Sequence, residues 1–210
     1  MSIARSNTPP VASLPREVRL IGGRFKRSKL PVLDHPGLRP TPDRVRETLF
    51  NWLGQDLAGW QVLDLFAGSG ALGFEAASRG AAQVTLVEKD SLLANSLRSS
   101  AARLGAQAVN VVCQDAFAWS ARAVDAAQRF DLILLDPPFA DDVSDKALQA
   151  ARPLLSAAGS AYLECNRACD AELLASWGWR LLRQGRAGAV HFHWLEPSVV
   201  GHGTTLSRPL

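Results

Sequence analysis

The stretch Val62–Gly73, VLDLFAGSGALG, decides the fold of this chain. An apolar run that ends near Asp64 and Phe66 meets a pair of glycines, Gly68 and Gly70, and a helical pattern follows. Glycine is used where a backbone must turn sharply or approach a ligand closely. The stretch therefore predicts a buried strand, a nucleotide-type binding loop and the first turn of a helix.

Apolar strand patterns and helical patterns alternate from Gln61 onward, which predicts an α/β fold with a parallel, doubly wound sheet. Only a short polar link separates the last two strand patterns, so they are expected to pair as an antiparallel hairpin. The expected strands are Val62–Phe66, Gln83–Glu88, Ala108–Cys113, Phe130–Asp136, Ser160–Cys165, Trp179–Arg183 and Ala189–Leu195. The expected helices are Ala71–Ser78, Asp90–Leu104, Ala116–Ala127, Val143–Leu155 and a short one near Cys169–Ala175.

A second motif, Asp131–Phe139, reads DLILLDPPF. Two successive prolines after a buried strand stiffen the backbone and remove two N–H donors. The backbone carbonyls and the Asp136 carboxylate then remain as fixed acceptors, which suit the two N–H donors of an exocyclic amine on a nucleobase. Phe139 offers a flat face on which the base can stack. The motif predicts an amine-binding site at the end of the fourth strand of the sheet.

Four successive expected strands carry an acid at or just beyond their carboxyl ends: Asp64, Glu88, Asp115 and Asp136. Ligands of open α/β sheets bind in the crevice outside these ends. Four acids around a glycine-rich loop indicate a ligand with hydroxyl groups and positive charge.

Gly68-x-Gly70-x-x-Gly73, followed by Glu88, also satisfies the dinucleotide-binding fingerprint. That reading places a pyrophosphate dianion close to Asp64 with no evident cation beside it. S-adenosylmethionine carries an ammonium and a sulfonium, which gain from the same carboxylate, and its ribose diol can use Glu88. We therefore predict S-adenosylmethionine as the cofactor and keep an NAD-dependent oxidoreductase as the alternative.

The first fifty residues form a basic head. They hold ten Lys/Arg and four acids, a net charge of +6, whereas the remaining 160 residues carry a net charge of −3. This asymmetry favours a polyanionic partner such as nucleic acid. Val18–Gly22 and Lys29–Leu33 are expected to form a small hairpin, and a helix to about Leu53 is expected to start with Thr41 as N-cap and Pro42 in its first turn. The predicted contacts to this nucleic-acid partner are Arg24, Lys26, Arg27, Lys29, Arg39, Arg44 and Arg46, with Arg46 taken as exposed.

Other features are weaker signals. The three cysteines share no metal-ligand spacing with the four histidines, so reduced thiols and no metal site are expected. Glu164 at the end of the fifth strand is read as a solvated acid rather than a substrate contact, and neither His191 nor His193 as a ligand. With no secretory signal or membrane-spanning run in the sequence, a cytoplasmic location is expected.

The chain is expected to divide into four parts. These are a disordered lead-in over 1–17, a basic hairpin-and-helix extension over 18–54, a methyltransferase domain over 55–196 and a tail over 197–210.

At the level of motifs, the chain resembles the class I S-adenosylmethionine-dependent amino-methyltransferases through DxFAGSG at 64–70, Glu88, Asp115-Ala116 and DPPF at 136–139. Arg19-x-Ile21-x-Gly23-Arg24 and the block LRPTPDRVRETLFNWL at 38–53 narrow the resemblance to the bacterial 16S rRNA (guanine-N2)-methyltransferase family (RsmD-like), over roughly residues 18–195.

The resemblance implies a monomeric enzyme that methylates the exocyclic N2 of a guanine in 16S rRNA, within the 30S subunit or an assembly intermediate. It implies a Rossmann-like sheet of seven strands with the last one antiparallel. Asp136, Pro137 and Phe139 would hold the guanine. The cofactor would be bound by Thr41, Asp64, Phe66, Gly68, Gly70, Glu88, Asp115 and Ala116.

The same amine-holding motif would serve another base, such as adenine N6 in DNA or a base of tRNA or rRNA. A protein-glutamine methyltransferase is disfavoured by the aspartate at position 136 and by the basic head, and the intact acids disfavour a catalytically inactive RNA-binding module.

Overall fold

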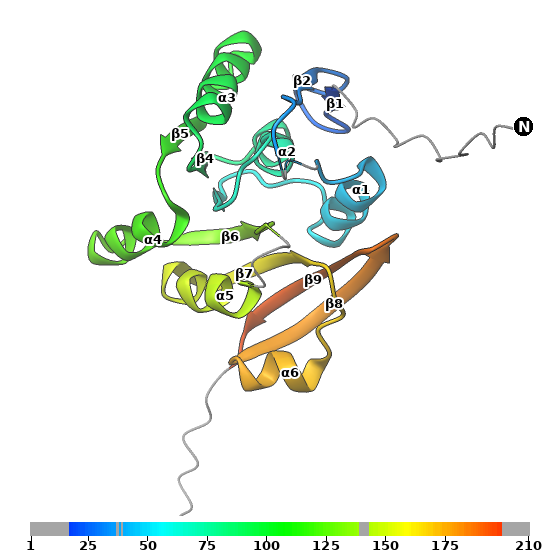
Figure 1. The fold of residues 1–210 in the computed structure, drawn as a ribbon, viewed down its shortest axis with the longest axis vertical. Coiled ribbons are helices and arrows are strands. Elements are labelled where there is room, and N and C mark those ends of the chain that lie inside the picture. Colours follow the sequence, from blue (N-terminus) through cyan, green and yellow to red (C-terminus); the bar gives the residue numbers. More distant parts are fainter. Residues whose placement is uncertain (1–16, 37, 39, 139–142, 199–210) are drawn as a thin grey trace, which may run out of the picture.

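A seven-stranded sheet forms the centre of the protein in the computed structural model, which describes residues 17–36, 38, 40–138 and 143–198. The strand order is β5-β4-β3-β6-β7-β9-β8 (Figure 1). β9 runs antiparallel to both of its neighbours, and the other pairs are parallel. The strands are β3 Gln61–Asp64, β4 Gln83–Glu88, β5 Val109–Cys113, β6 Phe130–Leu135, β7 Leu155–Cys165, β8 Trp179–Ala187 and β9 Val190–Pro197. The predicted doubly wound sheet with an antiparallel last strand is confirmed.

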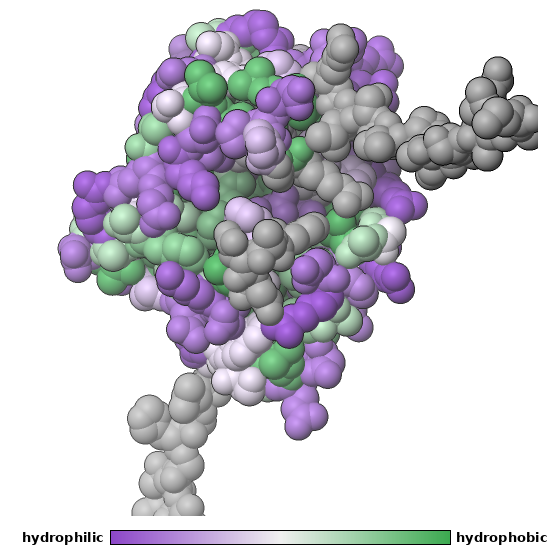
Figure 2. Space-filling model, viewed as in Figure 1, coloured by the Kyte–Doolittle hydropathy of each residue, from purple (hydrophilic) through white to green (hydrophobic). Residues whose placement is uncertain are grey.

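Helices cover both faces of this sheet and enclose two hydrophobic cores (Figure 1). On one face, the core draws on α1 Asp43–Trp52, α2 Ala71–Ser78 and α3 Ser91–Leu104. On the other face, it draws on α4 Ala116–Asp125, α5 Ser144–Ala151 and α6 Ala171–Ser176. Hydrophilic residues cover much of the face shown in Figure 2, with smaller hydrophobic areas between them. Within the described part of the chain, no helix is both long and apolar enough to cross a bilayer.

The main boundary error lies before β7. The sequence pattern predicts a helix over Val143–Leu155, but α5 ends at Ala151 and a single 3-10 turn, Arg152–Leu154, follows it. Pro153 lies in that turn, and proline cannot continue an α-helix because it lacks the N–H and clashes with the preceding turn. β7 therefore begins at Leu155, earlier than the predicted Ser160.

The basic head forms the predicted hairpin and helix. β1 Glu17–Arg19 pairs antiparallel with β2 Lys29–Pro31, and α1 follows. The prediction that Thr41 caps this helix is wrong, because Pro42 occupies the N-cap position and makes no side-chain capping bond. Thr41 is instead buried at the edge of the cavity described below. Since β1 starts at Glu17, the expected disordered segment is one residue too long; its remainder, 1–16, and residues 199–210 of the expected tail lie outside the described residues.

A buried ion pair joins this head to the rest of the protein, and it corrects the prediction for Arg46. The Arg46 side chain is fully buried rather than exposed, and its Nη1 lies 3.3 Å from Oε2 of the equally buried Glu75 on α2. The Glu75 carboxylate also accepts the backbone N–H groups of Ile21 and Gly22, each at 2.8 Å. Arg46 also donates to Asp43 at 2.6 Å and to the backbone carbonyl of Arg19 at 3.0 Å. The head is thus held by charge-assisted hydrogen bonds, and Arg46 is not an RNA contact.

We expect Arg46→Ala to lower the free energy of unfolding by about 2–4 kcal/mol, because it empties the space of a fully buried side chain and takes from the buried Glu75 one of the two arginines, Arg46 and Arg79, that pair with it. Urea denaturation followed by circular dichroism measures the change. Arg44→Ala, on the exposed side of the same helix, is the matched control and should alter stability by no more than about 0.5 kcal/mol. Equal effects of the two substitutions would contradict the assigned role of Arg46.

Candidate active site at the carboxyl ends of the strands

A cavity of about 810 Å³ opens where β3, β4, β6 and β7 end. Chain segments far apart in the sequence line it: the loop before α1, the glycine-rich loop, the loops after β4 and β5, and the DPP segment after β6. Most of the predicted site residues meet here. They are Thr41, Asp64, Phe66, Gly68, Glu88, Asp115, Ala116, Asp136 and Pro137.

The glycine-rich loop turns as the sequence predicts. Gly68 has φ +51° and Gly70 has φ +77°, a backbone region that residues with a Cβ rarely adopt. The Gly68 N–H donates to Oε2 of Glu88 at 2.9 Å, so the loop is tied to the end of β4. Gly70 does not line the cavity; it precedes α2, and a Cβ there would collide with Phe74 and Leu97. Its visible role is close packing, and its predicted cofactor contact stays a prediction.

Asp64 lies beneath this loop, only 2% exposed. Its Oδ2 accepts the backbone N–H of Gly73 at 3.0 Å, which fixes the carboxyl against the start of α2. Burial, reinforced by the charges of Asp136 and Glu88, raises the pKa of Asp64 to about 7. A cationic ligand in the cavity would favour the charged carboxylate and so lower this pKa.

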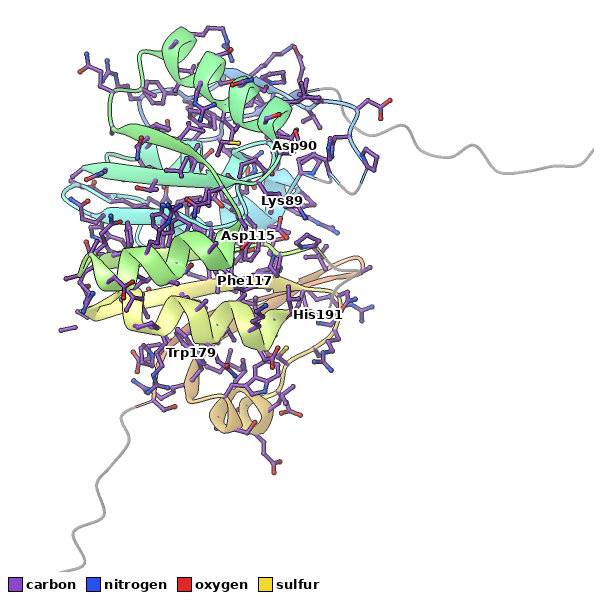
Figure 3. All side chains as sticks on the ribbon, turned by 60° about the vertical axis from the view of Figure 1, so that its left-hand side comes forward. Lys89, Asp90, Asp115, Phe117, Trp179 and His191 are labelled. Atoms are coloured by element: carbon purple, nitrogen blue, oxygen red, sulfur yellow. The ribbon has the colours of Figure 1, made fainter. Side chains whose placement is uncertain are left out.

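The far side of the cavity is formed by the loops after β4 and β5. Figure 3 shows Asp90, Lys89, Asp115 and Phe117 one below the other along this side. Asp115 caps α4 by accepting the N–H of Ala118 at 2.9 Å. Glu88 and Asp115 contribute carboxyl groups to the cavity wall, which the apolar side chains of Val87, Leu93 and Phe117 also line.

The DPP segment faces this wall. Asp136 and Pro137 line the cavity, and the hydroxyl of Thr41 lies 3.5 Å from Oδ2 of Asp136. The structure thus brings the loop before α1 onto the carboxyl group that the sequence singles out. Phe139, the predicted stacking residue, lies outside the described residues.

Glu164 is the functional candidate that the sequence reasoning missed. The expectation that it is a solvated acid is wrong, because it is only 2% exposed and lines the same cavity. The hydroxyl of Tyr162 donates to its Oε1 at 2.9 Å. Burial and the neighbouring Asp136 raise the pKa of Glu164 well above its usual range. The sequence offered one signal for this role: Glu164 is an acid near the carboxyl end of an apolar strand, as are Asp64, Glu88 and Asp136.

Four of the predicted RNA contacts, Arg24, Lys26, Arg27 and Lys29, are exposed on the hairpin. Lys29 pairs with Glu17 at 2.7 Å, which reduces the charge it offers to a partner. Arg44 is exposed on α1, and Arg39 lies outside the described residues. The exposed positive charge of the head is therefore concentrated in Arg24–Arg27.

Two cysteines and a histidine meet on the other side of β7, which sequence spacing did not predict. The potential ligand atoms of Cys165, Cys169 and His193 lie within 4.8 Å of one another, all buried. The Cys169 N–H donates to Nε2 of His193 at 3.3 Å. Nδ1 lies 3.7 Å from the Cys165 sulfur, so hydrogen-bond contacts join the three residues.

Comparison with known proteins places this architecture in a family. The model of the family described as Conserved hypothetical protein 95 matches residues 18–196. Ribosomal RNA small subunit methyltransferase D of Haemophilus influenzae is 38% identical over 180 residues, covering 84% of this chain and 92% of that protein. The protein of the same name from Escherichia coli is 48% identical over 123 residues, 59% of this chain and 61% of that protein. A solved structure of a putative methyltransferase, yhhF from Escherichia coli, is 36% identical with a TM-score of 0.72, covering 87% of this chain and 99% of that one.

The raised pKa of Asp64 predicts a characteristic pH dependence of stability. Between about pH 4 and pH 7 the folded protein holds a proton on Asp64 that the unfolded chain has lost. This group therefore makes the free energy of unfolding fall as the pH rises across that window, by up to about 1.4 kcal/mol per pH unit, with no further change above it. Asp64→Asn, which keeps an acceptor for Gly73, removes this contribution.

Urea denaturation of both proteins from pH 4 to pH 8.5 tests this prediction, because their difference isolates Asp64 from the other acids. Parallel stability curves for the wild type and Asp64→Asn would show that Asp64 has an ordinary pKa.

Proposed function

Because the chain belongs to the Conserved hypothetical protein 95 family, we propose that it transfers a methyl group from S-adenosylmethionine to the exocyclic N2 amine of a guanine in 16S rRNA of the small ribosomal subunit. The names of the relatives from Haemophilus influenzae and Escherichia coli support small-subunit rRNA as the substrate. The observation that carries the choice of an amine is the Asp136-Pro137 segment, which presents acceptors to the same cavity as the glycine-rich loop.

The cavity suits S-adenosylmethionine as cofactor. Asp64 and Glu88 contribute carboxyl groups to its wall and accept backbone N–H groups of the glycine-rich loop and of α2. The ammonium and sulfonium of the cofactor would offset this negative charge. Gly68 lets the backbone approach the ligand, Glu88 is placed to bind ribose hydroxyls, and Asp115 with Ala116 to bind the adenine.

The reaction needs little from the protein beyond alignment and electrostatics. When bound, S-adenosylmethionine supplies the electrophilic methyl group. Asp136 and the Pro137 carbonyl accept the two hydrogens of the guanine N2 amine and orient its lone pair. Transfer would form the N2–C bond as the S–C bond of the cofactor breaks, and Asp136, placed against the amine, would take up the proton that N2 loses. In this proposal Phe139 stacks on the guanine, which is extruded from its RNA loop.

Asp136→Ala should abolish most methyl transfer, lowering kcat/KM by about a hundredfold or more, because the amine loses its main acceptor. Radiolabelled transfer to unmodified 30S subunits, naked 16S rRNA, tRNA and DNA, with nucleoside analysis of the product, provides the measurement. N2-methylguanosine from the small-subunit samples is the expected product for the wild type. S-adenosylmethionine binding, measured by calorimetry, should be unchanged in the variant.

Asp125→Ala, an exposed acid on α4, serves as the matched control and should transfer at the wild-type rate. Wild-type transfer by Asp136→Ala would remove Asp136 from the mechanism. Label in N6-methyladenine of DNA would overturn the substrate, and no label with no cofactor binding would overturn the methyltransferase assignment itself.

The exposed charges of the hairpin are proposed to hold RNA phosphates. The double variant Arg24→Ala/Lys26→Ala should weaken RNA binding and make the plot of log K against log salt shallower by about 1.5, since two phosphate contacts are lost. Arg129→Ala, an exposed change just before β6 and outside the hairpin, should leave both quantities unaltered. An unchanged salt slope in the double variant would place the RNA elsewhere on the protein.

A further inference from the structure

We propose that Glu164 determines the choice of base: it accepts the N1–H of the target guanine while Asp136 accepts from the neighbouring N2 amine. The inference rests on the proposed function and deepens it by naming a second residue that contacts the substrate. Three observations support it: the place of Glu164 in the sheet, its fixed and buried carboxyl group, and the pattern of donors on guanine.

The sheet places the two carboxyl groups side by side. β6 and β7 are parallel neighbours in which Leu134 lies opposite Tyr162 and Leu135 lies opposite Leu163. One residue further along each strand stand Asp136 and Glu164, and alternation along a strand directs both to the face of the sheet that Tyr162 occupies. Both residues line the cavity, as this register requires.

The Glu164 carboxyl is held in place from below and above. The hydroxyl of Tyr162, which is fully buried, donates to its Oε1 at 2.9 Å. The hydroxyl of Thr41, which also lies 3.5 Å from Asp136, hydrogen-bonds to the Glu164 carboxyl from the loop before α1. Within the described ranges, no ion pair involves Glu164. A buried acid without a cation in a cavity wall is costly to the fold, which argues that a ligand uses it.

Guanine is the base whose donors match two adjacent acceptors. Its N1–H and N2 amine lie next to each other on the Watson–Crick edge, the edge by which extruded bases are read. Adenine and cytosine instead place an unprotonated ring nitrogen beside the amine, so a carboxyl oxygen there would face a lone pair. Burial and Asp136 favour the protonated form of Glu164, and an N1–H donated by the bound guanine would favour the charged, accepting carboxylate instead.

A substrate base that keeps the 2-amino group but lacks the N1–H donor tests the proposal. 2-Aminopurine keeps the 2-amino group but has no N1–H and no O6. The target guanine is first located by nucleoside mapping of the wild-type product. Two synthetic RNAs are then made, one with guanine and one with 2-aminopurine at that position. If the enzyme does not methylate naked RNA, both RNAs are first assembled into small subunits. The quantity measured is the ratio of kcat/KM for guanine RNA to kcat/KM for 2-aminopurine RNA.

The wild type should favour the guanine RNA, and removal of Glu164 should shrink that preference by about tenfold to a hundredfold, the range expected of one base-edge contact. Glu164→Ala should have a lower kcat/KM than the wild type on guanine RNA. Its kcat/KM on 2-aminopurine RNA should be nearly equal to its own value on guanine RNA. Glu164→Gln should shift the ratio further toward 2-aminopurine, because its amide can donate to the unprotonated N1. Effects of the missing O6 and of the altered amine are common to all variants and cancel in the comparison.

Glu172→Ala, an exposed change on α6, is the control that should keep the wild-type ratio. S-adenosylmethionine binding by each variant shows that the protein is folded. A wild-type ratio in both Glu164→Ala and Glu164→Gln would overturn the inference while leaving the proposed function intact. Failure of the wild type to methylate the guanine RNA would instead overturn the proposed function.

Discussion

The buried pair between Arg46 and Glu75 is the contact on which the assembly of this protein depends. Glu75 sits on a helix of the sheet domain, and its carboxylate gathers the backbone of the hairpin at Ile21 and Gly22 together with the Arg46 guanidinium. Arg46 also donates to the Thr41 carbonyl at 3.2 Å. The same pair that docks the basic head therefore sets the position of Thr41, whose hydroxyl reaches Asp136. A charged side chain buried this deeply has to be fully paired, so the docking geometry has little freedom.

The cavity, in contrast, brings several buried acids close together, which is electrostatically unfavourable. The raised pKa values of Asp64 and Glu164 express that cost, because each carboxyl is buried and faces other acids. A cofactor with two positive centres and a base with several N–H donors would both relieve it. The basic hairpin stands apart from this acidic cavity. Phosphates can thus be held at one place and the base delivered to another, with opposite charge preferences at the two.

Much of this arrangement was predictable from local patterns. Alternating apolar runs indicated the parallel strands, and the glycine-rich loop and the DPPF motif marked the two strand ends that meet in the cavity. The errors have physical causes. Pro153 ended α5 early, and Pro42 took the N-cap that Thr41 was expected to fill, because a proline stops or starts a helix more strongly than the surrounding pattern suggests. Arg46 lay off the apolar stripe of α1, and a helical pattern carries no information about a carboxylate on another helix.

The sequence by itself determined the α/β fold class with its parallel sheet, the loop that turns at Gly68 and the acids at the strand ends. Each of these depends on residues close together in the chain. The tertiary structure alone decided which distant groups meet: Arg46 with Glu75, Thr41 with Asp136, and Glu164 with the cavity rather than with solvent. Burial and pairing of a charge depend on what other segments bring to it, and a pKa follows from that environment. No pattern along the chain encodes those meetings.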